Sequence, residues 1–188
     1  MNIFKKWSII ILFFITIPLI ILNIKNKMFF TKIDQKKNND QPDHQINNST
    51  TFIYSTNGNL IYKFFSDKTN NYNKKKTTLF LNPILITYNK KGIPTWKIKS
   101  LKSKLINTNI IYFYNNVQIN NLIKKTIIQQ ITTKNAIFNL TTKDFFSDEK
   151  TIIIGHNLLS NSLKIKINFC NETIELIKDV KTSYKIKK

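Results

Sequence analysis

Residues 110–119 read Ile110-Ile111-Tyr112-Phe113-Tyr114-Asn115-Asn116-Val117-Gln118-Ile119. β-Branched and aromatic side chains are enriched in strands, so this segment predicts a strand. The run is interrupted at Asn115-Asn116 and the alternation continues at Val117, which predicts a tight turn or a bulge at the two asparagines. Asn tolerates the left-handed backbone conformation. With only three glycines in the chain, we expect Asn to take the place of glycine in turns.

Short apolar segments of this kind recur about every 10–15 residues from Thr50 onward, with an Asn57-Gly58 turn signal, a polar break at 68–76 and a charged loop at 144–149. This spacing predicts an all-β domain over residues 50–188, built as a sandwich, jelly roll or barrel. The alternation leaves open whether the inner face fills a core or lines an apolar slot. Strands are predicted at 52–54, 60–64, 77–88 with an interruption at Pro83, 96–100, 110–119, 126–132, 136–140, 151–154, 163–167 and 173–186.

An apolar run at residues 7–24 precedes this domain. As a helix it is about 27 Å long, close to the hydrocarbon thickness of a bilayer. No small-x-small cleavage site follows it, so we predict a retained transmembrane anchor rather than a signal peptide. The predicted order is a short cytoplasmic N-terminus at 1–6, the membrane helix at 7–24, a polar tether at 25–49 and the β domain on the far side. The anchor residues singled out are Trp7, Ile11, Phe14, Pro18 and Ile24.

The formal net charge is +20, and every basic residue is a lysine. Specific phosphate and guanine contacts are made mostly by arginine, which this chain lacks. Ile, Asn and Lys together make up about half of the chain, which is typical of A/T-rich coding sequence. We therefore interpret most of the charge as compositional drift on a solvated surface, with attraction to an anionic partner as the alternative.

The chain carries no recognisable catalytic or metal-binding motif. His44 and His156 do not form a metal-ligand spacing, and His156 is predicted to lie in a turn beside Gly155. Cys170 is the single cysteine, which excludes an intrachain disulfide and predicts a small buried side chain. We predict a protein that is not an enzyme and uses no metal or cofactor.

Four stretches resemble the LptC family of lipopolysaccharide export proteins. The resemblance extends over nearly the whole chain, and Ile93-Pro94-Thr95-Trp96 and the terminal Val-Lys-Thr-Ser-Tyr are its informative parts because composition does not produce them. It implies an OstA-like twisted β-jellyroll, shaped as a slightly open V, in the periplasm and anchored in the inner membrane by one helix. The four stretches are Gly92–Trp96, Ile110–Ile119, Gln130–Ala136 and Glu175–Tyr184.

The resemblance also implies a function. Members of the family receive lipopolysaccharide from an inner-membrane ABC transporter made of LptB, LptF and LptG, in which LptB hydrolyses ATP. They hold the acyl chains in an apolar slot and pass the molecule to LptA by stacking jellyrolls edge to edge. No cofactor and no nucleic acid are implied.

Family positions carry over to particular residues of this chain. The lipopolysaccharide contacts fall on Ser49, Phe80, Ile174 and Tyr184. The contact with LptA falls on Gly155 and Tyr184, and Gly155 also suits a positive-φ turn or a bulge. One position departs from the family pattern: the glycine that commonly ends the Tyr-x-Tyr strand is Asn115 here.

Two other functions stay open on sequence alone. One is a membrane-anchored basic protein that binds polyanions, whose affinity would fall steeply with salt. The other is a structural adaptor that links a transporter to a relay protein without holding lipid.

Overall fold

The described part of the chain is built from fourteen antiparallel strands, and none of it is helical. This computed structural model describes residues 41–123 and 126–185. The predicted cytoplasmic N-terminus at 1–6, the membrane helix at 7–24 and the tether up to residue 40 lie outside these residues. Within the described ranges, no helix is long and apolar enough to cross a bilayer. Residues Pro42–Lys188 form one unit, which contains all the strands.

Three long strands organise the sheet. The strands are β1 (His44–Tyr54), β2 (Leu60–Tyr72), β3 (Thr77–Leu81), β4 (Ile84–Tyr88), β5 (Pro94–Lys99), β6 (Lys102–Ile106), β7 (Ile110–Asn121), β8 (Ile128–Asn139), β9 (Asp144–Ser147), β10 (Thr151–Gly155), β11 (Leu158–Ser162), β12 (Lys164–Asn168), β13 (Thr173–Lys178) and β14 (Lys181–Tyr184). The first half of β2 pairs with β4 and its second half with β3. In the same way β7 divides its pairing between β6 and β5, and β8 between β10 and β9.

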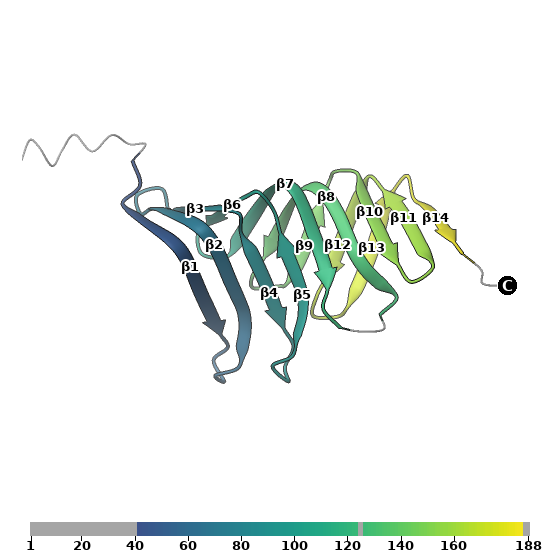
Figure 1. Cartoon of the computed structure of the whole chain (residues 1–188), viewed down its shortest axis with the longest axis horizontal. Helices are drawn as coiled ribbons and strands as arrows, with labels where there is room; N and C mark the ends of the chain where they lie inside the picture. The colour runs from purple at the N-terminus through teal and green to yellow at the C-terminus, as the bar shows by residue number, and fades with distance from the viewer. Residues whose placement is uncertain (1–40, 124–125, 186–188) are drawn as a thin grey trace, which may run out of the picture. The chain divides into compact units, whose positions relative to one another are not determined.

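Each long strand therefore belongs to two layers of one folded sheet. We name as front layer β4, β5, β10, β11 and β14 with the strand halves paired to them, and as back layer β3, β6, β9, β12 and β13 with the other halves. Figure 1 shows β10 and β11 in front and β9, β12 and β13 behind. We call the line where the chain crosses between layers the spine. The opposite side, where hairpin turns end each layer, is the mouth.

Asparagines produce the bends at the spine. Asn115 and Asn116 have φ angles of 62° and 57°, and the β7–β8 register shifts between Tyr114 and Val117. The bulge predicted from the sequence is thus confirmed. Six of the eleven non-glycine residues with positive φ are asparagines, because the short amide side chain makes this backbone conformation less costly. The predicted turn at Asn57-Gly58 is also present, with Gly58 at φ 78°.

Hydroxyl side chains satisfy backbone groups at the spine. Ser100 Oγ donates to the carbonyl oxygen of Lys102 at 2.8 Å, and Ser162 Oγ donates in the same way to Lys164 at 3.2 Å. Every buried polar residue of the described ranges is a Ser or Thr. A small hydroxyl fits where the two layers converge and can donate to a backbone carbonyl two residues on.

The core lies between the layers. Its members are mostly Ile and Phe from alternate positions of each strand, as the period of two predicts. Ile98, Phe113, Ile131, Phe145 and Ile165 are each 0% exposed. The buried apolar residues are Tyr62, Phe64, Leu85, Ile98, Ile111, Phe113, Val117, Ile119, Ile131, Ala136, Phe138, Phe145, Ile153, Ile165 and Ile167.

Several predicted strand bounds were wrong, because backbone pairing rather than side-chain alternation sets where these strands begin and end. Strand β1 begins at His44, inside the segment predicted to be tether, because it pairs with β2 along almost its whole length although its side chains are largely exposed. Strand β2 continues to Tyr72 through the predicted polar break. Strand β8 is one strand where two were predicted, and 173–186 contains two strands separated by Asp179 at φ 50°.

Three predictions about individual segments were also wrong. The predicted charged loop contains strand β9, in which Phe145 is fully buried. Strands β6 and β11 were not predicted, because their polar alternation resembles loop sequence. Cys170 is exposed rather than packed, since it lies in the turn after β12. His156 lies in a turn, as predicted.

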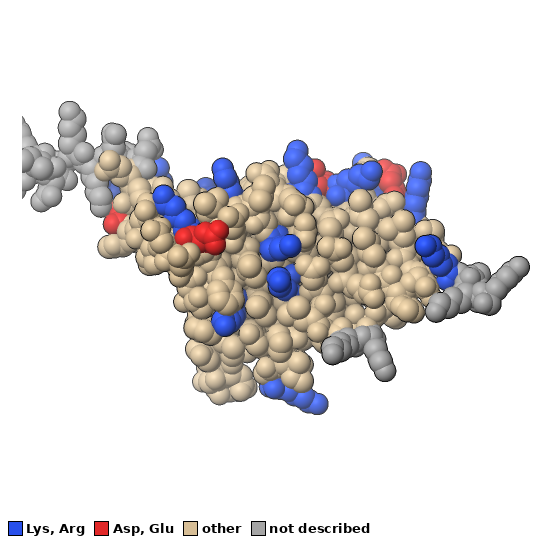
Figure 2. Space-filling model, in the orientation of Figure 1, with Lys and Arg blue, Asp and Glu red and all other residues tan. Residues whose placement is uncertain are grey.

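Lysines are spread over many strands. Figure 2 shows them scattered across one face with few acidic side chains among them. An ion pair joins Lys164 Nζ to Asp148 Oδ1 at 3.2 Å. This dispersion agrees with the interpretation of the net charge as mainly compositional.

Candidate binding interior and sheet edges

Ser49 and Phe80 lie together at the N-terminal end of the interior. Phe80 on β3 is partly buried, and its ring centroid is 4.6 Å from that of Phe64. Its partner across the β2–β3 ladder is Thr69. Ser49 Oγ is 2.7 Å from Thr69 Oγ1 and 3.2 Å from Ser66 Oγ, so the three hydroxyls form a small cluster at the spine.

Ile174 and Tyr184 lie at the other end. Ile174 on β13 is opposite Ile167 and packs on the core while remaining partly exposed. Tyr184 ends β14 opposite Leu158, and 71% of it is exposed. The four predicted lipid contacts are therefore not one cluster: they form two pairs at opposite ends of the folded sheet.

The interior between these two pairs is filled by side chains. Leu85, Ile119 and Ile153 are at most 1% exposed, and they come from strands spread along the sheet. The question that the alternation left open is thus answered for this conformation: the middle is a packed apolar core. At the N-terminal end a pocket of about 640 Å³ remains on the back layer, lined by residues that include Asn71, Thr78 and Leu105.

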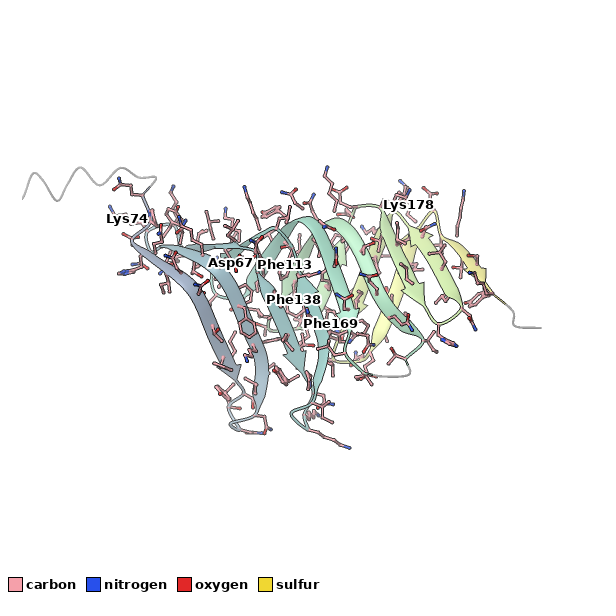
Figure 3. The ribbon with its side chains drawn as sticks, in the orientation of Figure 1. Asp67, Lys74, Phe113, Phe138, Phe169 and Lys178 are labelled. Atoms are coloured by element: carbon pink, nitrogen blue, oxygen red, sulfur yellow. The ribbon has the colours of Figure 1, made fainter. Side chains whose placement is uncertain are left out.

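Aromatic side chains join the two layers at the mouth. Tyr62 on the front layer donates from its hydroxyl to the carbonyl oxygen of Leu140 on the back layer at 2.7 Å. Trp96 on β5 meets Phe169, which follows β12, with ring centroids 5.5 Å apart. Phe169 also contacts Phe138 at 5.7 Å. Figure 3 shows Phe113, Phe138 and Phe169 in a row from the spine toward the mouth.

These mouth contacts were not predicted from the sequence. Phe169 lies beyond the clean alternation of 163–167 and gives no periodic signal of its own. Tyr62 stood out only as one member of a predicted strand. These contacts join segments that are far apart in the sequence; Tyr62 and Leu140, for example, are 78 residues apart. Only the strand order of the whole sheet brings them together.

Gly155 ends β10 at an irregularity in the sheet. The β8–β10 register shifts between Ile154 and Gly155, so the predicted bulge is present. The predicted positive φ is wrong, because only Gly58 and Gly92 among the described glycines have it. A Cβ at Gly155 would overlap the carbonyl oxygen of Ile127, so it is the close approach of another backbone that requires glycine here.

The folded sheet has free edges at both ends. Within the described residues β1 pairs only with β2, β13 only with β12, and β14 only with β11. One edge therefore lies at the N-terminal end and two at the C-terminal end. A free edge offers a row of backbone N–H and C=O groups that another strand can pair with.

The pKa of Tyr62 and the pKa of Asp144 are shifted by their surroundings. Burial raises the pKa of Tyr62 well above its ordinary value, and the nearby Cys170 adds to this. Hydrogen bonds from Thr142 and then Asn168 lower the pKa of Asp144. In the described ranges no three His, Cys, Asp or Glu side chains gather as a metal-ligand set.

Comparison with known proteins agrees with this architecture. A family model described as "Lipopolysaccharide-assembly, LptC-related" matches residues 9–185. The lipopolysaccharide export system protein LptC of Escherichia coli K12 is 32% identical over 182 residues, which cover 97% of this chain and 94% of the relative. The chain belongs to the LptC family. The LptC of Haemophilus influenzae is 30% identical over 169 residues, covering 81% of each chain.

A solved structure shows the same fold outside the LptC family. It is LptH of Pseudomonas aeruginosa, described as the LptA-homologous periplasmic component of a lipopolysaccharide transport device. It superposes with a TM-score of 0.54 at 7% sequence identity and covers 66% of this chain and 95% of LptH. The folded sheet described above is therefore a jellyroll of the LptA type.

Proposed function

We propose that this chain carries lipopolysaccharide from an inner-membrane transporter to a periplasmic relay protein. It takes lipopolysaccharide from the ABC transporter formed by LptB, LptF and LptG and passes it to LptA. ATP is hydrolysed by the transporter, and this chain contributes no catalysis. The residues at 7–24 hold it in the inner membrane, with the β domain in the periplasm.

One observation carries this proposal: a single apolar interior extends between the two ends of the folded sheet, and both ends have free edge strands. Phe80 lies on β3, one strand in from the N-terminal edge strand β1, and Ile174 lies on β13, a C-terminal edge strand. Core side chains are continuous between them. An acyl chain that takes the place of one layer's side chains in these contacts would be shielded from water along the whole interior, from one end of the sheet to the other. Burial of each methylene contributes about 0.8 kcal/mol and has no directional preference, so a chain slides without large barriers.

The packed middle sets a condition on transport. Since the core residues are fully buried, acyl chains enter only when the layers separate, which turns the packed sandwich into an open V. The spine stays intact because long strands cross it, whereas the mouth is held by side chains alone. Separation at the mouth is therefore the least costly opening.

The free edge strands at the two ends are the docking surfaces for neighbouring proteins. β-Strand pairing with a neighbouring jellyroll continues the sheet and aligns the two interiors. The β1 edge meets the transporter, and the β13 and β14 edges meet LptA. Tyr184 lies on the C-terminal edge strand β14. Gly155 lies two strands in, in register with Tyr184 across Leu158 of β11.

Photocrosslinking in cells tests the proposal. Benzoylphenylalanine at Phe80 or Ile174 is expected to capture lipopolysaccharide, and the yield is expected to depend on ATP hydrolysis by the transporter. Benzoylphenylalanine at Thr77, on the β3 strand but offset by an odd number of positions from Phe80, is the matched control. Capture of neighbouring protein alone from Phe80 and Ile174 would reject lipid transport and favour a structural adaptor.

A further inference from the structure

A pocket of about 430 Å³ lies at the mouth between the two layers. The front layer supplies the β4–β5 hairpin, including Lys90 and Lys91. The back layer supplies Lys143 from the turn after β8 and Glu172 from the turn after β12. No predicted site residue is part of it. Figure 2 shows lysine side chains at the tip of the β4–β5 hairpin.

The floor of the pocket is apolar. Trp96 and Phe169 line it, and these two rings are the contact that joins the layers at the mouth. Phe169 leads directly from the pocket to Phe138 and Phe145 in the core. An amphiphile seated here would therefore have its apolar part directed into the interior.

Hydrogen bonds within each layer hold the walls of the pocket in place. The amide of Phe169 donates to the carbonyl oxygen of Lys143 at 3.1 Å, which joins the two back-layer turns. On the front layer the Thr87 and Thr95 hydroxyls are 2.8 Å apart and tie β4 to β5. Lys143 Nζ lies 5.8 Å from the centre of the Tyr62 ring, so its ammonium group is directed across the mouth.

The rim carries more positive than negative charge. Three lysines and one glutamate line the pocket, which leaves a net charge of +2. Among residues 41–123 and 126–185, no carboxylate forms an ion pair with Lys90, Lys91 or Lys143. Three ammonium groups around an aromatic floor complement an anionic head group with apolar tails.

We infer that this mouth pocket binds the phosphate-bearing head of an amphiphile, with its acyl chains directed past Phe169 into the interior. Lys90, Lys91 and Lys143 hold the phosphate, and Trp96 and Phe169 pack on the first carbons of the apolar part. This inference rests on the proposed function, because it locates the head group of the lipid that the interior carries. Phosphorylated glycolipid and ordinary phospholipid share this chemistry, and the experiment separates them.

The chain's own thiol provides the measurement. Cys170 is exposed, lines the pocket and is the only cysteine of the protein. The full-length chain in a nonionic detergent is titrated with lipid A, and the rate of Cys170 alkylation by N-ethylmaleimide is followed. Occupancy of the pocket is expected to slow alkylation at least tenfold. Dephosphorylated lipid A and phosphatidylglycerol are titrated in parallel.

Charge-matched variants isolate the rim. Replacing Lys90, Lys91 and Lys143 together by Ala is expected to raise the lipid A concentration for half-protection about tenfold, in line with the loss of charge-assisted hydrogen bonds. Replacing Lys102, Lys134 and Lys150 by Ala removes the same charge from exposed positions outside the pocket and is expected to change nothing. Dephosphorylated lipid A is expected to bind both variants and the parent equally and weakly.

The outcomes are distinct. Equal protection of the parent and the rim variant by lipid A would overturn the pocket and leave lipid transport standing. So would crosslinking of lipid from Phe80 and Ile174 without any protection of Cys170. Absence of both crosslinking and protection would overturn the proposed function and the pocket together. Protection by phosphatidylglycerol as strong as by lipid A would assign the pocket to phospholipid and overturn the glycolipid as its source.

Discussion

The hydroxyl of Tyr62 donates a 2.7 Å hydrogen bond to the carbonyl oxygen of Leu140 and so joins the front and back layers at the mouth. Tyr62 is 2% exposed, and its ring meets the edge of Phe138 at 5.9 Å. Among the hydrogen bonds of the described residues, this is the one that connects a front-layer side chain to a back-layer backbone group at the mouth.

Tyr62→Phe tests the strength of this contact. The substitution keeps the ring but leaves the carbonyl of Leu140 without its donor, so we expect a loss of about 1–2 kcal/mol in the free energy of unfolding. Urea denaturation followed by tryptophan fluorescence measures it. Tyr112→Phe, on the outer face of β7, is the control and is expected to cost less than about 0.5 kcal/mol.

The same residue predicts an alkaline limit to stability. Burial raises the pKa of Tyr62, so the folded chain keeps the phenol neutral where the unfolded chain ionises it. Its contribution is complete below about pH 10, the ordinary tyrosine value, and is lost as the pH rises from there toward the folded-state pKa. The free energy of unfolding is therefore expected to fall above about pH 10, and less steeply in Tyr62→Phe. Parallel curves for the parent and the variant would contradict this.

Asn115 tests the bulge at the spine. Its φ of 62° is energetically unfavourable for any residue with a Cβ, and most of all for a β-branched one. Asn115→Gly is expected to be neutral or to stabilise by up to about 1 kcal/mol, whereas Asn115→Val is expected to destabilise by about 1–2 kcal/mol. Thermal unfolding checks both. Equal melting temperatures for the Gly and Val variants would show that this backbone conformation is not strained.

Sequence periodicity found the strands with a repeated apolar face and missed most of those without one, such as β6, β9 and β11. The alternation at 163–167 marks β12 because Ile165 and Ile167 point into the core. In β1 nearly all side chains are exposed, and only its end at 52–54 was predicted. The rest of the strand depends on backbone pairing with β2, which leaves no periodic trace. The sequence predicts a loop around Phe145 because Asp144, Asp148 and Glu149 lie close to it in the chain, although Phe145 is buried in the short strand β9.

The site was predicted less completely than the fold. The family resemblance selects Phe80 and Ile174, and both face the interior, as alternate positions of strands β3 and β13 require. Their distribution to opposite ends depends on strand order, which joins β13 to β12 and β3 to β6. The Trp96–Phe169 contact likewise depends on how the layers fold over each other, and local sequence contains no sign of it.

Gly155 tests the close approach of β10 to the loop before β8. Since a Cβ would meet the carbonyl oxygen of Ile127, Gly155→Ala is expected to cost about 1–3 kcal/mol. Gly92→Asn is the control: Gly92 has φ 72° with open space around it, so Asn is expected to cost less than about 1 kcal/mol. Denaturation of the two variants side by side provides the comparison.

The function of Gly155 calls for a second substitution. Gly155→Arg places a bulky charge in register with Tyr184, two strands in from the C-terminal edge, and is expected to weaken capture of LptA at least tenfold. A pull-down with purified LptA measures it. Gly155→Ala is expected to weaken capture less than Gly155→Arg at a similar loss of stability. Unchanged capture by Gly155→Arg would remove Gly155 from the docking edge.

Tyr184 tests the backbone of that edge directly. The amide of Lys185 donates to the carbonyl oxygen of Asn157, so the alternation of an antiparallel ladder directs the Tyr184 amide to the free side of β14. Tyr184→Pro removes this free donor without breaking a bond to β11 and is expected to weaken LptA capture at least tenfold with little change in stability. Tyr184→Phe keeps the donor and the ring and is expected to bind as the parent does. If Tyr184→Pro captures LptA normally while Tyr184→Ala does not, the side chain and not strand pairing makes the contact.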